Sequence, residues 1–204
     1  MSFYENRILP HVIHLTCGAP AVMHQRQLIV PQATGRVLEI GMGSGLNIPL
    51  YDPTRVTKVW GLEPSEGMRR KAAAQVAAAP FELEWLELPG EEIPLDSKSV
   101  DSIVLTYTLC TIPDWRQVLK QMRRVLKPGG QLLFSEHGKA PDAAVARWQS
   151  VVDPLWGKLA GGCSIKRDIP GLLREGGFSI SGMDEGYLPM IPKFAAYNYA
   201  GRAS

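Results

Sequence analysis

The sequence predicts an α/β protein with a doubly wound, seven-stranded sheet, mostly parallel with an antiparallel last strand and with helices on both faces. Three observations lead to this fold. Strand-like and helix-like segments alternate after Arg36. Several of the strands are mostly apolar, as parallel strands covered on both faces are. The first strand also runs straight into a glycine-rich turn, which in such sheets lies at the carboxyl edge where ligands bind.

Seven segments have the composition of strands, and the second, fourth and fifth are the most apolar. The expected strands are Val37–Ile40, Lys58–Glu63, Leu83–Leu88, Ser102–Thr108, Gln131–Glu136, Phe178–Met183 and Tyr197–Arg202.

Three helices are expected between these strands. One spans Ser65–Ala78, begins at a serine cap and is rich in alanine. The second spans Asp114–Leu126, where apolar residues recur at helical spacing behind an aspartate cap. A third runs from about Asp142 to Gly157, and Pro154 is expected to kink or end it.

Residues 1–30 precede the first core strand and are expected to form a helical lid over a cleft, while residues 31–204 form a single domain. The apolar residues of the lid share one helical side. They are Ile8, Leu9, Val12, Ile13 and Leu15.

Composition narrows the function classes. With 22 basic and 20 acidic side chains interspersed, no nucleic-acid partner is expected. No segment reaches the roughly 20 apolar residues of a membrane span, so stable membrane insertion is not expected either. Cys17, Cys110 and Cys163 are too dispersed for a disulfide framework or a CxxC zinc motif. We therefore expect a cytoplasmic protein with reduced thiols, a monomer or homodimer.

The strongest local signal is the turn after the first strand, where Gly41, Gly43 and Gly45 alternate with other residues. A Cβ there would block the close approach of a nucleoside to the main chain. Glu63 stands 22 residues after Gly41 at the end of the second strand, where a carboxylate can accept hydrogen bonds from ribose hydroxyls.

Two details distinguish this turn from a nicotinamide site. Leu46 occupies the place of the third glycine of GxGxxG. Glu39 stands two residues before the first glycine, where a carboxylate would repel a pyrophosphate but could pair with the ammonium of a methionine moiety. The pattern favours a sulfonium amino-acid nucleoside.

From about Arg36 to Gly130 the chain resembles the class I S-adenosylmethionine-dependent methyltransferases, with a Rossmann-like fold and a type 11-like core. Besides the glycine loop and Glu63, Pro89–Leu95 resembles the adenine-contact loop and Leu126–Gly130 the turn before the fifth strand. The resemblance implies S-adenosylmethionine as cofactor. The implied cofactor-binding residues are Glu39, Gly41, Met42, Gly43, Gly45, Asn47, Glu63, Pro64, Gly90, Glu91 and Thr106.

The adenine loop departs from the family at Pro89, where an aspartate is common. Backbone groups of Gly90 and the side chain of Glu91 could substitute; the alternative for Glu91 is an ordinary surface acid.

The acceptor is expected over the carboxyl ends of the fourth and fifth strands. His137 is the candidate general base, and its alternative role is a hydrogen bond to a loop carbonyl. Cys110 also fits a small buried apolar role. The segments Ser135–His137, Trp148–Trp156 and Gly161–Cys163 resemble alkyl thiol methyltransferases. This implies a small thiol acceptor, unless the tryptophans simply fill the core. The expected substrate-binding residues are Tyr107, Cys110, Trp148 and Cys163.

His11, His14 and Cys17 recur every three residues, so they lie on one side of a helix. Zinc binding is the alternative to a stripe that faces the cleft or solvent, and no metal is predicted.

The expected function is methyl transfer to a small molecule by in-line displacement, with S favoured over N or O as the acceptor atom. Neither an Asn/Asp-Pro-Pro-aromatic motif nor a Pro-Cys pair is present, which argues against DNA methylation. The alternatives are methylation of a lipid headgroup reached through the apolar side of residues 8–15, a nicotinamide-dependent oxidoreductase, and a cofactor-binding module without catalysis.

Overall fold

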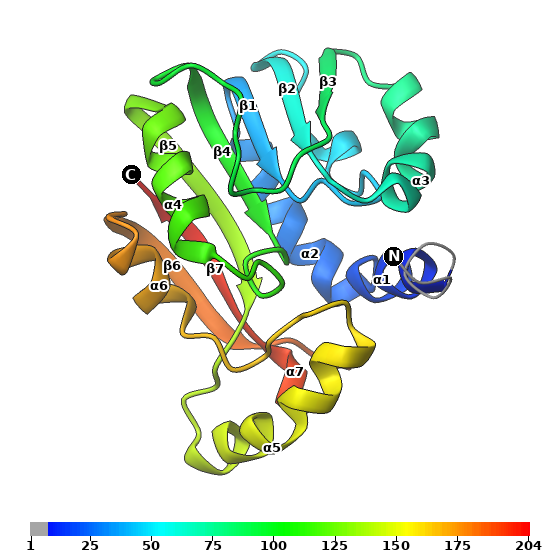
Figure 1. The fold of residues 1–204 in the computed structure, drawn as a ribbon, viewed down its shortest axis with the longest axis vertical. Coiled ribbons are helices and arrows are strands. Elements are labelled where there is room, and N and C mark those ends of the chain that lie inside the picture. Colours follow the sequence, from blue (N-terminus) through cyan, green and yellow to red (C-terminus); the bar gives the residue numbers. More distant parts are fainter. Residues whose placement is uncertain (1–7) are drawn as a thin grey trace.

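The computed structural model describes residues 8–204, which form one seven-stranded sheet in the order β3-β2-β1-β4-β5-β7-β6 (Figure 1). Only β7 runs antiparallel to its neighbours, β5 and β6, so the predicted topology is confirmed. The strands are β1 (Gly35–Ile40), β2 (Val56–Leu62), β3 (Glu82–Leu86), β4 (Val100–Thr106), β5 (Leu126–His137), β6 (Ile180–Tyr187) and β7 (Tyr197–Ala203).

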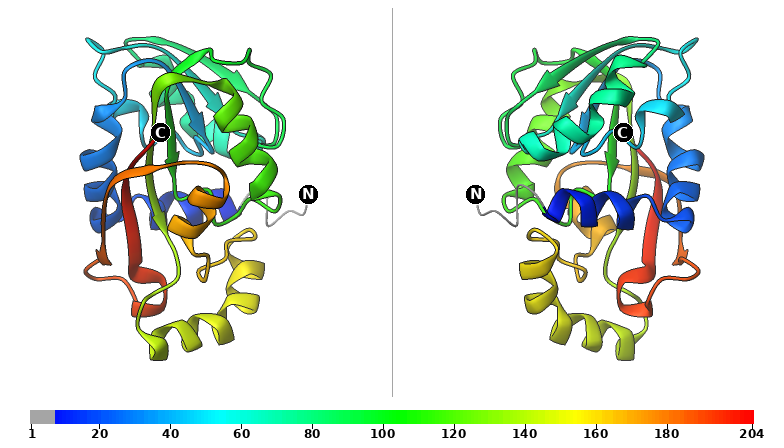
Figure 2. Two further views of the ribbon diagram at one scale, coloured as in Figure 1. Left: turned by 90° about the vertical axis from the view of Figure 1, so that its left-hand side faces the viewer. Right: turned by 90° about the vertical axis from the view of Figure 1, so that its right-hand side faces the viewer.

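The helices connect these strands and cover both faces of the sheet, with α2 on one side and α4 on the other (Figure 2). The face under α4 is filled by Val118, Leu119, Met122 and Val125, all fully buried, which explains the helical spacing of these residues. The α-helices are α1 (Leu9–Cys17), α2 (Pro20–Ile29), α3 (Glu66–Ala77), α4 (Trp115–Val125), α5 (Ala143–Leu159), α6 (Ile169–Glu175) and α7 (Lys193–Ala196).

The predicted caps are confirmed, because the Ser65 and Asp114 side chains accept hydrogen bonds from backbone N–H groups in the first turns of α3 and α4. Helix α5 does not end at Pro154, because it continues through this residue to Leu159. The ribbon of α5 bends along its length (Figure 1), in agreement with the alternative expectation of a kink. Pro154 and Ser150 are both exposed, so the carbonyl that a proline leaves unpaired lies on the solvent side. The sequence analysis missed α6, which the side chain of Asp168 caps.

The N-terminal segment forms two helices with different surroundings. Helix α2 buries Val22, Arg26 and Ile29 against the body of the protein. Helix α1 lies between the carboxyl edge of the sheet and α5 (Figure 2). Residues 1–7 of the expected lid lie outside the described residues.

The expectation of a single apolar side on the N-terminal helix is wrong. Leu9 is buried and Ile13 lines a cavity, whereas Ile8, Val12 and Leu15 are exposed. The two sets follow separate stripes at helical spacing, so one stripe faces the protein and the other faces solvent.

Candidate active site

A cavity of about 550 Å³ lies at the carboxyl ends of β1, β2, β4 and β5. Helix α1 borders it on one side, and the end of α5 and the segment before α7 border it on others. This is the size of a typical small-molecule site and the position at which open parallel sheets bind ligands. Nine of the predicted site residues line it: Gly41, Met42, Gly43, Glu63, Thr106, Tyr107, Cys110, His137 and Cys163.

The glycine loop presents bare main chain to this cavity. Gly41 and Gly43 both have φ in the left-handed region, at 67° and 60°. A Cβ on Gly41 would collide with Thr108, and one on Gly43 would lie 3.2 Å from Cε of Met68. Gly45 does not line the cavity; a Cβ there would meet Ile48 and α3, so this glycine permits helix packing instead.

Glu63 lies directly after β2 and holds the loop in place. Its carboxylate accepts hydrogen bonds from the backbone N–H groups of Gly43 at 3.0 Å and Ser65 at 2.8 Å. Burial raises the pKa of Glu63 above its ordinary value, and these two hydrogen bonds partly oppose the shift. Because the carboxylate also borders the cavity, its remaining lone pairs are available to a ligand.

Arg26 of α2 is a site residue that the sequence analysis missed. It is only 5% exposed and lines the cavity. One guanidinium nitrogen donates to Oδ1 of Asn47 at 2.8 Å and to Oγ1 of Thr106 at 2.6 Å. Its Nε has no partner among the described residues. A buried cation with a free donor is suited to a carboxylate ligand. The sequence does hold a signal for this role. Arg26 is spaced from Val22 and Ile29 so that all three share one side of a helix, which places a charge on the inward side.

Glu39 and Asn47 lie behind the cavity and do not line it, which corrects the expected direct contact of Glu39 with the cofactor ammonium. Both Glu39 oxygens are occupied, one by the amide of Asn47 at 2.8 Å and the other by the hydroxyl of Tyr51 at 2.7 Å. Burial raises the pKa of Glu39 to about 7. Glu39 therefore orients Asn47, and Asn47 in turn orients Arg26.

The expected adenine-contact loop does not border the cavity, because neither Gly90 nor Glu91 lines it. Pro64, another expected cofactor contact, does not line it either. Gly90 is buried near α4, where a Cβ would lie 3.1 Å from a methyl group of Val118. A contact between this loop and adenine stays a prediction.

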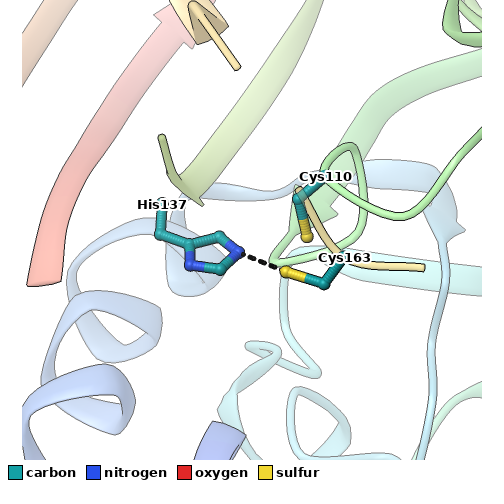
Figure 3. Close-up of side chains that lie close together, drawn as sticks. All are labelled: Cys110, His137 and Cys163. Carbon is teal, nitrogen blue, oxygen red and sulfur yellow. Dashed lines mark hydrogen bonds between the residues drawn. The ribbon is translucent and has the colours of Figure 1, made fainter. Parts of the chain in front are cut away.

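The acceptor end of the cavity holds a cluster of sulfur and imidazole, Cys110, His137 and Cys163 (Figure 3). Nε2 of His137 lies 3.1 Å from Sγ of Cys163, and the other ring nitrogen is hydrogen-bonded to the backbone of Ala195. The indole N–H of Trp156 donates to the same sulfur at 3.4 Å. His137 thus bonds the backbone of helix α7 rather than a loop carbonyl, and its other ring nitrogen faces a thiol.

The three groups influence one another electrostatically. A hydrogen bond from the Cys110 thiol, together with the positive charge of His137, lowers the pKa of Cys163 despite its burial. The pKa of Cys110 is raised by its hydrogen bond to Cys163 and by burial. Burial alone would lower the pKa of His137, but the neighbouring Cys163 outweighs it and raises this pKa.

Glu136 fixes the loop that carries Tyr107 and Cys110. One of its oxygens accepts from the backbone N–H groups of Thr108 at 2.7 Å and Leu109 at 3.1 Å. Tyr107 has φ of 54°. Its hydroxyl donates to Oδ1 of Asn198 at 2.8 Å.

The prediction that Trp148 borders the acceptor pocket is wrong, and so is the alternative that it fills the core. Its side chain is 65% exposed on α5. The inward side of this helix carries Gln149, Asp153 and Trp156, and Trp156 lines the cavity as expected. Trp148 is one position out of phase with that side.

Within residues 8–204, His11, His14 and Cys17 do not come together as a metal-binding group. Instead Nδ1 of His14 lies 2.8 Å from the hydroxyl of Ser44, which connects α1 to the glycine loop, and Cys17 lines the cavity.

The sequence is similar to several methyltransferases. Human thiol S-methyltransferase TMT1B is 36% identical over 143 residues, which cover 67% of this chain and 57% of that protein. Phosphatidylethanolamine N-methyltransferase of Cereibacter sphaeroides is 30% identical over 118 residues, 55% of this chain and 57% of that protein. The chain therefore covers less than two thirds of either relative.

The fold is similar to solved structures over nearly the whole chain. A S-adenosylmethionine-dependent methyltransferase from Leishmania major superposes with a TM-score of 0.70 at 18% identity, covering 98% of this chain and 80% of that one. None of the helices in residues 8–204 has the length and apolar character needed to cross a membrane.

The family described as "Methyltransferase domain" matches residues 38–134, the segment that contains the second half of β1, the glycine loop, Glu63 and most of β5. Together with the strand order and the cavity at the carboxyl edge, this match identifies residues 38–134 as a methyltransferase domain.

Proposed function

We propose that the protein transfers the methyl group of S-adenosylmethionine to a small thiol. The observation that carries this proposal is a single cavity with two chemically different ends. One end offers bare main chain, a carboxylate and an arginine, and the other is lined by thiols, an imidazole and apolar side chains. The similarity to thiol S-methyltransferases supports the same choice of acceptor.

The residues at the first end fit the cofactor. The lone pairs of Glu63 suit ribose hydroxyls, and the guanidinium of Arg26, which borders the cavity, suits the carboxylate of a methionine moiety. The main chain at Gly43 leaves room for close approach. Thr106 and Asn47, which hold Arg26, act here as positioning residues.

S-Adenosylmethionine supplies an electrophilic methyl group on a sulfonium. The acceptor sulfur forms the new bond to carbon, the electron pair of the broken C–S bond stays with the donor sulfur, and the thiol proton leaves to solvent. For such an in-line displacement the protein must align the acceptor and exclude water. Apolar side chains of α1 and of the segment before α7, among them Ile13 and Phe194, border the acceptor end and suit this task.

The position of α1 along the cavity supports its expected function as a lid. Its bond from His14 to Ser44 would close the cavity over bound ligands. We also propose a cytoplasmic protein, monomeric or homodimeric, without a nucleic-acid partner, on the basis of its nearly balanced charge.

A lipid headgroup is the second candidate acceptor, and two observations favour it. One relative is a phosphatidylethanolamine N-methyltransferase. The outer side of α1 also exposes Ile8, Val12 and Leu15. Cosedimentation with phospholipid vesicles and methylation of phosphatidylethanolamine would support this candidate over a free thiol.

The test is an assay of S-adenosylhomocysteine release with a panel of a short alkyl thiol, a primary amine, a phenol and phosphatidylethanolamine vesicles. We expect turnover with the thiol alone. Turnover with only the amine or the vesicles would contradict the choice of acceptor. Calorimetry with S-adenosylhomocysteine and NAD separates the methyltransferase from an oxidoreductase, and cofactor binding without any turnover would indicate a non-catalytic module.

A further inference from the structure

The cluster at the acceptor end has the composition of a metal site. Two thiols and one imidazole nitrogen converge, and all three ligand atoms lie within 4.8 Å of one another. They come from three separate parts of the chain: the loop after β4, the end of β5 and the loop after α5. We propose that Cys110, His137 and Cys163 bind one Zn²⁺ ion whose fourth coordination position faces the cavity and receives the acceptor thiol.

The distances suit zinc. A tetrahedral ion with Zn–S of about 2.3 Å and Zn–N of about 2.0 Å places its ligand atoms roughly 3.5–3.8 Å apart. The pair His137 and Cys163, at 3.1 Å, has to open by only a few tenths of an ångström. The backbone connects the two cysteine loops, because the N–H of Ser164 donates to the carbonyl of Cys110 at 3.0 Å.

Groups outside the cluster orient the ligands as they do in zinc sites. The bond between His137 and the backbone of Ala195 fixes the ring and leaves Nε2 toward the sulfurs. The indole of Trp156 donates to Sγ of Cys163, a bond that also stabilises a thiolate ligand.

The open side of the site determines its chemistry. Cys110, His137 and Cys163 all line the same cavity, so a fourth ligand would enter from the acceptor space. Two cysteines and one histidine with an open fourth position are a ligand set of catalytic zinc. Two thiolates also balance the charge of the ion.

The binding step rests on the proposed function and deepens it. The incoming thiol displaces a zinc-bound water molecule and releases its proton to solvent, and its sulfur stays bound as a thiolate, because a coordinating thiol is deprotonated. His137 is then a metal ligand, which replaces the sequence-based expectation of a general base.

The experiment uses the full chain, purified without chelators, and measures its metal content by plasma mass spectrometry. Chelator-stripped protein is then titrated with Zn²⁺ and with Co²⁺. We expect one zinc per chain and, with cobalt, a near-ultraviolet sulfur-to-metal absorption band. Cys110→Ser, His137→Ala and Cys163→Ser should each lose at least tenfold in zinc affinity. Cys17→Ser is the matched control, a thiol in the same cavity but outside the cluster, and should retain zinc.

Three results would overturn the zinc site: no stoichiometric binding after zinc titration, a Cys17→Ser loss equal to the others, or a Cys110–Cys163 disulfide in the purified protein. Calorimetry with S-adenosylhomocysteine keeps this test separate from the proposed function. If metal-free protein binds S-adenosylhomocysteine and methylates thiols at full rate, only the zinc proposal is refuted. If the protein binds zinc but does not bind S-adenosylhomocysteine, the methyltransferase proposal is refuted instead.

Discussion

The two ends of the cavity are built in different ways. The cofactor end is built mainly on the glycine loop and on Glu63, 20 positions after Gly43, to which the fold adds Arg26 from α2. The acceptor end uses side chains brought together from positions 110, 137 and 163 by the fold. A motif therefore reveals what the first end binds, whereas the second end becomes visible only when the chain is folded. If the two ends are functionally separate, variants in one should leave the other intact.

The largest effect is expected at Glu63. Glu63→Gln removes the charge that orders the glycine loop and suits ribose hydroxyls, so the Kd for S-adenosylhomocysteine should rise on the order of 100-fold, the equivalent of about two lost charge-assisted hydrogen bonds. Calorimetry measures this Kd. Glu175→Gln, an exposed acid on α6, is the control and should change nothing. A Kd within threefold of wild type for Glu63→Gln would contradict this role.

The acceptor end is tested with a pair of tryptophans on α5. Trp156→Ala should raise the KM for an alkyl thiol about tenfold or more, because it removes an aromatic wall of the cavity and a hydrogen bond to Cys163. The Kd for S-adenosylhomocysteine should stay within about threefold, since no cofactor contact is lost. Trp148→Ala, which removes an equal but exposed side chain, should affect neither quantity. Equal effects of both variants would contradict the division of the cavity into two functionally separate ends.

A pH dependence is expected from the buried carboxyl behind the cofactor end. The pKa of Glu39 is raised from 4.5 to about 7, so the folded protein holds a proton that the unfolded chain releases near pH 4.5. The contribution of Glu39 to the free energy of unfolding is fully present below the pKa of the unfolded chain and is lost as the pH rises through about 7. The loss amounts to roughly 1–3 kcal/mol. Urea unfolding between pH 5 and 8 measures it. Glu39→Gln should have a flatter profile; identical slopes would refute the assignment.

The smallest effect is expected at the lid. His14→Ala removes one hydrogen bond between α1 and the glycine loop, worth about 0.5–1.5 kcal/mol. Amide hydrogen exchange in α1 should become about two- to tenfold faster, with little change in β4 or β5. His11→Ala, on the same helix, is the control. Faster exchange throughout the protein would indicate general destabilisation rather than release of the lid.

The sheet, the helix caps and the glycine loop could be predicted because their signals are local. Strand hydrophobicity, the caps Ser65 and Asp114, and the spacing from Gly41 to Glu63 all depend on neighbours in sequence. These features need no knowledge of the partner strands.

The errors concern properties that depend on tertiary surroundings. Trp148 and Gln149 differ by one position, and only the packed helix shows that Gln149 faces inward. The position of Glu39 one layer behind the cavity depends on Tyr51, and the role of Arg26 depends on Thr106. The cysteine and histidine cluster has no characteristic spacing, so the sequence could not bring its members together.

The backbone at Tyr107 has a thermodynamic consequence. A side chain larger than glycine in the left-handed region costs roughly 1–2 kcal/mol, and here this residue lies between the two ends of the cavity. The two backbone bonds to Glu136 and the bond from Tyr107 to Asn198 offset that cost. The molecule thus gives up some of its folding stability to keep one turn rigid, at the junction where donor and acceptor have to meet in line.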